Sequence, residues 1–261
     1  MPVAERFHGA NTIEAGRLSP YWGEHAARYR FALDYVADKR VLDIACGTGY
    51  GIGIMQDKAS AVVGVDLDNE ALQSARAECA GSSLAIRADG LSLPFADGIF
   101  DVVTSFETLE HLTERPAFLA ELYRVLLRGG RLILSTPNAI FTQPVNGIPS
   151  NPYHVHEYEP AELRSELARY FEIESYLGQV LHPSIRVPPF TIAQQRLPND
   201  LRKHTAVLAW RAFNKIPVRM RERLSDVIWQ KPFYPGESDY LFTEESLQTA
   251  PVTVAVCRKI Q

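Results

Sequence analysis

The feature that most constrains this chain is an apolar run that leads into a turn with three glycines. Val41 to Ala45 is typical of a buried strand, and the next six residues, Cys46 to Gly51, carry glycine at every second position from 47. Glycine tolerates positive φ and lets a ligand lie against the backbone without a Cβ clash. A strand that enters such a turn indicates the first βαβ unit of an α/β fold.

Strands and helices alternate along the rest of the chain. Apolar runs predict further strands at Ala61–Val65, Leu84–Ile86, Phe100–Ser105, Arg131–Ser135, Phe171–Leu177 and Val252–Val256. Helical spacing of apolar residues predicts helices at Glu24–Ala37, about 69–78, 116–127 and from Pro160 onward. Such alternation favours a mainly parallel, doubly wound sheet.

The predicted organisation is a single domain over residues 1–261, with an N-terminal helical cap at 1–38. About 70 residues separate the last two predicted strands. A gap of that length must carry structure of its own. Because 201–229 is compatible with helix, interrupted by Pro217, we expect a helical insertion or lid at 179–250.

Composition and charge bound the function. The chain has a net charge of −4, which does not favour binding to DNA or another polyanion. The three cysteines are too far apart for a disulfide framework or a zinc site, and they indicate a reducing compartment. The N-terminus lacks the apolar run of a signal peptide, and no stretch approaches the length of a membrane span. We therefore expect a cytoplasmic protein.

The predicted insertion has its own charge. The segment from residue 186 to residue 231 contains ten basic residues and only three acidic ones, and large apolar side chains are interspersed among them. A basic, amphipathic lid favours an anionic acceptor, such as a nucleotide sugar, a lipid-linked glycan or a phosphorylated molecule. The alternatives are a solvated helical face that packs on the domain, or a homodimer interface.

The run from Val41 to Gly51 resembles motif I of the class I S-adenosylmethionine-dependent methyltransferases. The other matches follow in order: Asp66 in GVDLD, Asp89 in RADG, the run Leu93–Phe95, the run Phe100–Val103 and the pair Gly129–Gly130. The family's fold is Rossmann-like, and the resemblance implies a seven-stranded, mainly parallel sheet with an antiparallel last strand. The alternative is an unrelated α/β fold in which these acids are ordinary strand-end carboxylates.

The same resemblance implies S-adenosylmethionine as the cofactor. Asp66 matches the residue that binds the ribose hydroxyls, and Asp89 matches the one near the adenine amino group. Asp43, inside the strand end, can accept a hydrogen bond from a cationic amino group. The predicted cofactor contacts are Asp43, Ala45, Gly47, Gly49, Asp66, Leu67, Asp89, Gly90 and Phe106.

The segment Ser105–Leu112 carries a second chemical signal. If a helix begins at Glu107, then Glu107, Glu110 and His111 share one face. Two close carboxylates repel each other, and a divalent cation resolves that repulsion. Alternatively, the two acids favour a helix start, and His111 is a general base without metal or a packed side chain.

The Glu-x-x-Glu-His pattern resembles the metal-dependent 2′-O-methyltransferases of small RNAs and the ubiquinone-pathway O-methyltransferases. In the former, a histidine beyond the fifth strand completes the ligand set. Alignment on Glu157-Tyr158 makes His154 that residue, with His156 as the alternative. The predicted ligands of Mg²⁺ or Mn²⁺ are Glu107, Glu110, His111 and His154. The predicted catalytic residues, which orient or deprotonate the acceptor, are His111 and His154.

The N-terminal pattern Glu24-His25, Arg28-Tyr29 and Phe31-Ala32 resembles bacterial methyltransferases of surface-polysaccharide and other glycan pathways, as does the run His154–Tyr158. The leading hypothesis is therefore an O-methyltransferase of a sugar or glycan hydroxyl. A second is methylation of a quinone precursor or small aromatic. An RNA 2′-hydroxyl is weaker, because no separate RNA-binding module is visible. A non-catalytic binding module is the alternative from another class, and the intact cofactor motifs count against it.

Overall fold

The computed structural model describes residues 22–183 and 234–260, together with isolated residues between 208 and 227. The first 21 residues of the predicted cap lie outside the described residues. So does most of the predicted insertion, including the expected helix over 201–229 and most of the basic residues.

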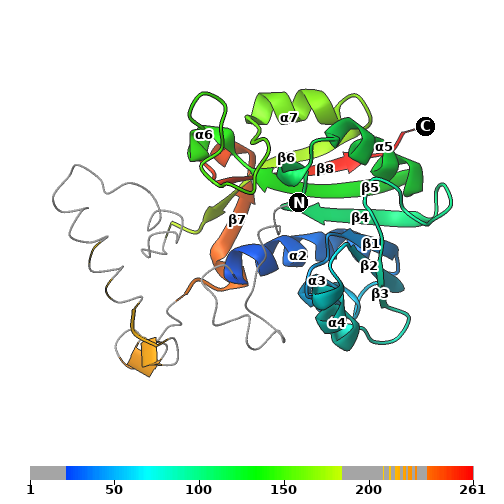
Figure 1. The fold of residues 1–261 in the computed structure, drawn as a ribbon, viewed down its shortest axis with the longest axis horizontal. Coiled ribbons are helices and arrows are strands. Elements are labelled where there is room, and N and C mark those ends of the chain that lie inside the picture. The colour runs from blue at the N-terminus through cyan, green and yellow to red at the C-terminus, as the bar shows by residue number, and fades with distance from the viewer. Residues whose placement is uncertain are drawn as a thin grey trace.

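Within the described part of the chain, eight strands form one mixed sheet in the order β3-β2-β1-β4-β5-β8-β6-β7 (Figure 1). The strands are β1 Arg40–Ile44, β2 Ala61–Asp66, β3 Leu84–Arg87, β4 Phe100–Phe106, β5 Leu126–Pro137, β6 Glu172–Leu181, β7 Tyr240–Thr243 and β8 Val252–Arg258. The pairs among β1 to β5 are parallel, whereas β8 is antiparallel to β5 and β6, and β7 is antiparallel to β6. The expected Rossmann-like α/β fold with an antiparallel last strand is confirmed.

Helices cover both faces of this sheet. The described helices are α2 Trp22–Val36, α3 Tyr50–Met55, α4 Asn69–Glu78, α5 Arg115–Val125, α6 Ala139–Thr142 and α7 Pro160–Leu167, with 3-10 turns η1 Leu109–His111, η2 Glu237–Asp239 and η3 Glu244–Ser246. In Figure 1, α2, α3 and α4 lie on one face, and α5 and α7 on the other.

Each face carries its own buried core. Leu132 and Leu134 of β5 pack in the core that includes residues of α5 and α7, and Ile133 between them packs in the core that includes residues of α2 and α3. Side chains alternate between the faces along a strand, so an apolar run without alternation fits a strand covered on both sides. The sequence 132–134 therefore determines a central strand.

The sheet has one strand more than expected. Residues 240–243 lie inside the range predicted as a helical insertion, yet they pair antiparallel with β6, which itself continues past 179 to Leu181. Phe242 of this added strand packs on Phe31 of α2, with ring centroids 4.7 Å apart. A four-residue strand gives little periodic signal, and its pairing depends on the long-range contact with α2.

No helix among the described residues has the length and apolar character needed to cross a membrane.

Candidate active site

The glycine turn after β1 is built for close approach by a ligand. Ala45, Gly47 and Gly49 all have positive φ, at 56°, 53° and 84°. A Cβ on Gly49 would lie 2.5 Å from the Cα of Ala75, so that position requires glycine for packing as well as for conformation. No atom lies within 4 Å of a Cβ placed on Gly47. One side of the turn is therefore packed and the other is open.

Asp66 fixes this turn from the neighbouring strand. One carboxylate oxygen accepts a hydrogen bond from the Gly47 N–H at 2.9 Å, and the other accepts one from the Asp68 N–H at 2.9 Å. Leu67, directly after it, is 56% exposed. Asp66 and Leu67 thus lie together at the carboxyl edge of the sheet.

Asp89 lies just after the next strand at the same edge. It is exposed, and its carboxylate accepts a hydrogen bond from the Leu91 N–H at 2.9 Å. A Cβ on Gly90 would lie 2.9 Å from the ring of Phe118, so this turn packs closely on α5. Parallel strands present their carboxyl ends on one edge, which explains why the sequence-predicted residues after β1, β2 and β3 meet there.

Asp43 lies inside the protein, unlike Asp66 and Asp89. Its side chain is fully buried, and it accepts hydrogen bonds from the Thr104 hydroxyl at 2.7 Å and from the Tyr29 hydroxyl at 3.2 Å. Burial raises its pKa to about 7, although the bonds from Thr104 and Tyr29 act in the opposite direction. The ring of Phe106 packs edge-on against Tyr29 at 4.9 Å. Asp43 and Phe106 therefore support the site through Tyr29.

These features fit S-adenosylmethionine. The open side of Gly47 allows backbone approach, and Asp66 supplies oxygens at the strand end where ribose hydroxyls are bound in doubly wound folds. Leu67 presents an apolar side chain beside that acid. The predicted contacts thus lie at the carboxyl edge of the sheet, apart from the buried Asp43 and Phe106, which support the site through Tyr29.

The helix expected to begin at Glu107 is absent, and this expectation was wrong. β4 continues through Phe106, and the Glu107 N–H donates to the Ser135 carbonyl at 3.1 Å. Glu107 has a φ of 51° and turns the chain out of the strand, so the 3-10 turn begins only at Leu109. Its carboxylate accepts a 2.6 Å hydrogen bond from the Ser135 hydroxyl. Glu107 consequently does not share a helical face with Glu110.

Glu110 is a fully buried carboxyl group. One oxygen accepts a hydrogen bond from the Thr136 hydroxyl at 2.9 Å, whereas Oε1 has no hydrogen-bond partner in the part of the chain that the structure describes. Its backbone carbonyl accepts bonds from the N–H groups of Val155 and His156 at 2.7 and 3.2 Å. Burial, reinforced by the nearby charge of Glu107, raises its pKa well above the ordinary value.

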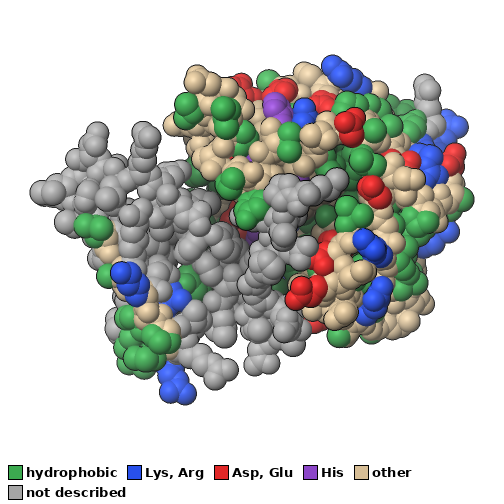
Figure 2. Space-filling view, viewed as in Figure 1, with side chains coloured by type: hydrophobic (Ala, Val, Ile, Leu, Met, Phe, Trp, Pro, Cys, Tyr) green, Lys and Arg blue, Asp and Glu red, His purple; other side chains and the backbone are tan. Residues whose placement is uncertain are grey.

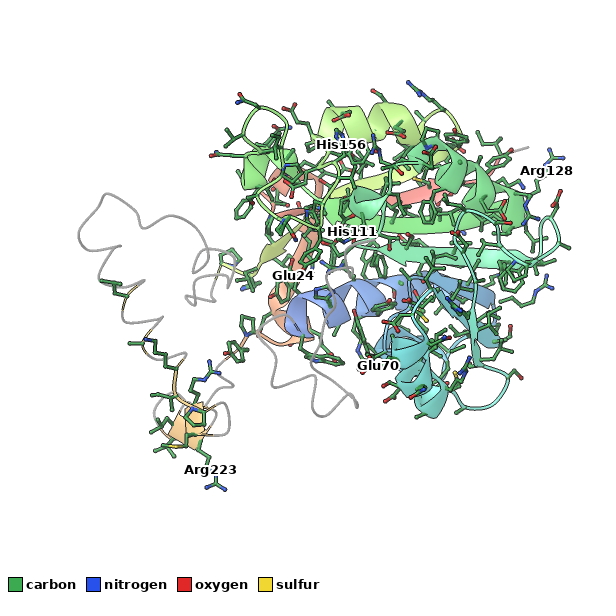
Figure 3. The ribbon with its side chains drawn as sticks, in the orientation of Figure 1. Glu24, Glu70, His111, Arg128, His156 and Arg223 are labelled. Atoms are coloured by element: carbon green, nitrogen blue, oxygen red, sulfur yellow. The ribbon has the colours of Figure 1, made fainter. Side chains whose placement is uncertain are left out.

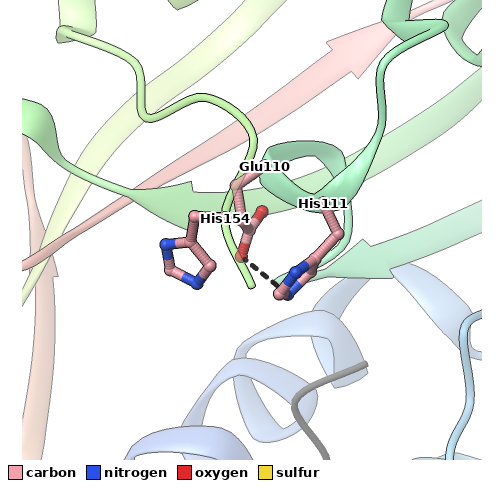
Figure 4. Close-up of side chains that lie close together, drawn as sticks. All are labelled: Glu110, His111 and His154. Carbon is pink, nitrogen blue, oxygen red and sulfur yellow. Dashed lines mark ion pairs between the residues drawn. The ribbon is translucent and has the colours of Figure 1, made fainter. Parts of the chain in front are cut away.

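His111 and His154 meet beside this carboxyl group (Figure 4). The His111 and His154 rings lie edge to face, 4.9 Å between centroids, and His111 Nε2 is 3.9 Å from Glu110 Oε1. One ligand-type atom from each of the three residues lies within 4.8 Å of the others. The structure therefore brings Glu110, His111 and His154 together, and it does not include Glu107 in this group.

The hydrogen bonds define the tautomers of the two rings. His111 Nδ1 lies 3.0 Å from the Tyr153 carbonyl, which can only accept, so Nδ1 carries the proton and Nε2 is the basic atom of the neutral ring. His154 Nδ1 lies 2.6 Å from Glu157, and its Nε2 accepts a 2.9 Å bond from the Asn151 amide. His111 is thus the better placed base.

Glu157 and Asn151 received no role in the sequence analysis. Glu157 is buried, and although burial opposes its ionisation, hydrogen bonds from His154 and Thr142 hold its pKa below the ordinary value. The Tyr153 N–H donates to the Asn151 oxygen at 3.0 Å, which directs the amide nitrogen toward His154. The sequence signal that could have identified Glu157 was its position three residues after His154 in a polar loop.

His156, the alternative to His154, faces elsewhere. Its Nε2 pairs with Glu162 of α7 at 2.9 Å, and its ring packs edge-on against Tyr158 at 4.5 Å. Figure 3 shows His156 toward α7, apart from His111. His156 is therefore not a member of the group around Glu110.

The group also fits a divalent cation. Oε1 of Glu110, which has no hydrogen-bond partner among the described residues, is a buried oxygen suited to a cation. His111 Nε2 would add one nitrogen, and His154 Nε2 would add a second by releasing the Asn151 amide, which leaves coordination positions open. Nitrogen ligands favour a transition-metal ion such as Mn²⁺ over Mg²⁺, which prefers oxygen.

Comparisons with known proteins agree with this geometry. A family model described as a methyltransferase domain matches residues 42–134. A protein of Mycolicibacterium smegmatis named "probable S-adenosylmethionine-dependent methyltransferase" is 36% identical over 181 residues, which cover 68% of this chain and 70% of that protein. A demethylmenaquinone methyltransferase of Thermus thermophilus is 41% identical over 103 residues, 38% of this chain and 47% of that protein.

The solved structures show the same fold. An S-adenosylmethionine-dependent methyltransferase from Mesorhizobium loti superposes with a TM-score of 0.54 at 19% identity, over 95% of this chain and 100% of that one.

Proposed function

Since this chain belongs to the S-adenosylmethionine-dependent methyltransferases, we propose that it methylates a hydroxyl oxygen of a sugar or glycan intermediate, with His111 as the general base. The observation that carries this proposal is the hydrogen bond from His111 Nδ1 to the Tyr153 carbonyl. That bond fixes the ring and leaves the basic nitrogen on the side of Glu110.

A hydroxyl is a poor nucleophile at neutral pH, so the protein must take its proton as the new bond forms. When bound, S-adenosylmethionine would supply a methyl group on its sulfonium; the acceptor oxygen attacks that methyl carbon in line, and S-adenosylhomocysteine leaves as the C–S bond breaks. His111 Nε2 accepts the hydroxyl proton, a contribution of about 10² to 10⁴ in rate for a positioned base. Glu110 Oε1 lies 3.9 Å from this nitrogen, beside the imidazolium that results. His154, held by Glu157 and Asn151, orients the acceptor.

A bound cation would be held by Glu110, His111 and His154. It would lower the pKa of the acceptor hydroxyl and would suit two vicinal oxygens, as in a hexose. The basic residues between 186 and 231 support an anionic acceptor; of the three that the structure describes, Lys215 and Arg223 are exposed, and Arg221 is buried and bonds to Tyr234.

The test is methyl transfer to a panel of nucleotide sugars and short oligosaccharides. Turnover is measured as release of S-adenosylhomocysteine, and the product is analysed for its added mass and for the position of the new methyl group. We expect O-methylation of a sugar, and a loss of about 100-fold or more in kcat for His111→Ala. His156→Ala is the matched control, because that ring pairs with Glu162 outside the group. Equal losses in both variants would count against His111 as the base.

The same assay tests the cation. If Glu110, His111 and His154 hold a cation, the activity falls when a chelator is added and returns with Mn²⁺. The activity of Glu110→Gln then no longer responds to added metal. Activity that is unchanged by a chelator leaves His111 to act without metal.

A second candidate is a quinone precursor or small aromatic acceptor. It is favoured by the likeness to the Thermus demethylmenaquinone methyltransferase. It is also favoured by an apolar surface after α6, where Val145 and Ile148 are 72% and 70% exposed. Figure 2 shows hydrophobic and uncharged side chains around α6. Catechols in the acceptor panel separate the two candidates, because turnover of an aromatic without turnover of any sugar would favour the second.

A further inference from the structure

Arg28 of α2 is a buried cation that the proposed chemistry does not use. It is 1% exposed and is the largest of the fully buried side chains in the described part of the protein. Its Nη1 donates to the Gln179 side-chain oxygen at 2.8 Å, and lies 3.6 Å from Glu24 and 3.9 Å from Glu107. One end of the guanidinium is therefore paired and partly neutralised.

The other edge of the same guanidinium has no partner in the part of the chain that the structure describes. Nε and Nη2 are both buried and make no hydrogen bond to any residue that the structure describes. These two nitrogens present parallel N–H bonds, the fork that binds the two oxygens of a carboxylate side by side. Leaving buried donors unpaired is costly, so a complete unpaired fork indicates a ligand that supplies two oxygens.

The surroundings place this fork next to the glycine turn. The adjacent residue, Tyr29, bonds to Asp43 at the end of β1 and contacts the ring of Tyr50, the first residue after the turn, at 5.2 Å. Gln179 donates to the Glu24 carbonyl at 2.8 Å, which fastens this part of α2 to β6. Figure 3 shows Glu24 at the same end of the sheet as His111. Arg28 itself interacts electrostatically with Tyr50, which places its guanidinium near the predicted cofactor surface.

We propose that Arg28 binds the carboxylate of the amino-acid end of S-adenosylmethionine through Nε and Nη2. Because Glu24 and Glu107 flank Arg28, the amino-acid end of the cofactor is a better ligand than a simple anion. Glu24 and Glu107 would repel an isolated anion, whereas an amino acid also brings an ammonium group that they attract. Recognition of both charges on one ligand accounts for a buried cation set between two carboxylates.

The test compares three ligands by calorimetry, without an acceptor. They are S-adenosylhomocysteine, its decarboxylated analogue, which keeps the amine, and methylthioadenosine, which lacks the whole amino-acid end. In the wild-type protein we expect loss of the carboxylate to weaken binding by about tenfold to a hundredfold, the range for a buried hydrogen bond to a charged group. In Arg28→Met we expect S-adenosylhomocysteine to weaken similarly, and methylthioadenosine to bind as in the wild type.

The decisive quantity is the coupling between the two changes. Once Arg28 is replaced, removal of the ligand's carboxylate should cost almost nothing further. Arg30→Met is the matched control, because Arg30 lies on the same helix but is exposed and pairs with Glu237. If the carboxylate matters equally in wild type and Arg28→Met, or if methylthioadenosine weakens as much as S-adenosylhomocysteine, the proposal is refuted.

A folding defect does not remove the test. The wild-type series stands alone, since equal affinity for S-adenosylhomocysteine and its decarboxylated analogue would overturn the proposal without any variant. If Arg28→Met does not fold, Arg28→Lys takes its place in the cycle, because it keeps the charge but lacks the two-nitrogen fork. A carboxylate on the acceptor is the competing source of the same chemistry. It would leave all three affinities unchanged in the variant, which also counts against the proposal.

Discussion

Replacing Asp43 by asparagine should change how the stability of this protein depends on pH. The carboxyl group is fully buried, with the Thr104 hydroxyl at 2.7 Å and the Tyr29 hydroxyl at 3.2 Å. Asparagine has the same shape, and its oxygen can still accept the bond from Thr104. The substitution therefore removes a buried ionisable group while it preserves most of the packing.

The size of the effect follows from the pKa of Asp43, which burial raises from 3.8 to about 7. Below about pH 4 the group is protonated in both the folded and the unfolded chain, and its ionisation costs nothing. Between about pH 4 and pH 7 the unfolded chain loses the proton and the folded chain keeps it, so the free energy of unfolding decreases. Above about pH 7 the loss is complete, at about 4 kcal/mol.

The assay is urea unfolding of the wild type and Asp43→Asn, followed by tryptophan fluorescence from about pH 4 to about pH 8. The other titrating groups are common to both proteins and cancel in the difference. The stability of Asp43→Asn relative to the wild type should therefore rise by about 4 kcal/mol across this range. Asp34→Asn, at an exposed position of α2, is the matched control.

A difference between Asp43→Asn and the wild type that is independent of pH would refute the reasoning. It would mean that the folded protein ionises Asp43 as readily as the unfolded chain does. The hydrogen bonds from Thr104 and Tyr29 would then outweigh burial.

Three further substitutions test the site. Gly49→Ala should cost at least about 2 kcal/mol in urea unfolding, because the residue has a φ of 84° and the added methyl would lie 2.5 Å from the backbone of α4; a stable variant that still binds S-adenosylhomocysteine would contradict the packing argument. Glu157→Gln should lower kcat by about tenfold to a hundredfold with little change in cofactor affinity, because His154 loses the carboxylate that holds it; steady-state kinetics and calorimetry check both parts. Tyr29→Phe should destabilise the protein by about 1 kcal/mol and raise the pKa of Asp43 further, since it removes a donor to that carboxylate; the same urea titrations should show the slope with pH extending to higher pH.

The cofactor surface was predictable because its signals are local. Positive φ at Gly47 and Gly49 is a property of the residue type, and the edge on which Asp66 and Asp89 meet follows from parallel strands. The apolar runs also determined the central strands, because a run covered on both faces must be a buried strand. Short strands gave weaker signals, so 240–243 was missed.

The acceptor side depended on contacts that the sequence does not encode locally. Spacing alone put Glu107 and Glu110 on one face, but β4 continues through Phe106, and pairing with Ser135 turns Glu107 away. Tertiary contacts likewise determine that His154, and not His156, lies beside Glu110, since each histidine bonds to a different acid.

What the sequence determined by itself is the α/β fold, the methyl donor and the edge of the sheet at which we expect that donor to bind, because glycine conformations and apolar runs act through neighbouring residues. Only the tertiary structure decided that Arg28 of α2 meets Gln179 of β6, 151 residues away, and that its other two nitrogens have no hydrogen-bond partner among the described residues. The burial that raises the pKa of Asp43 is likewise a product of packing. Such charges depend on which distant segments exclude water from them, and no local pattern specifies that.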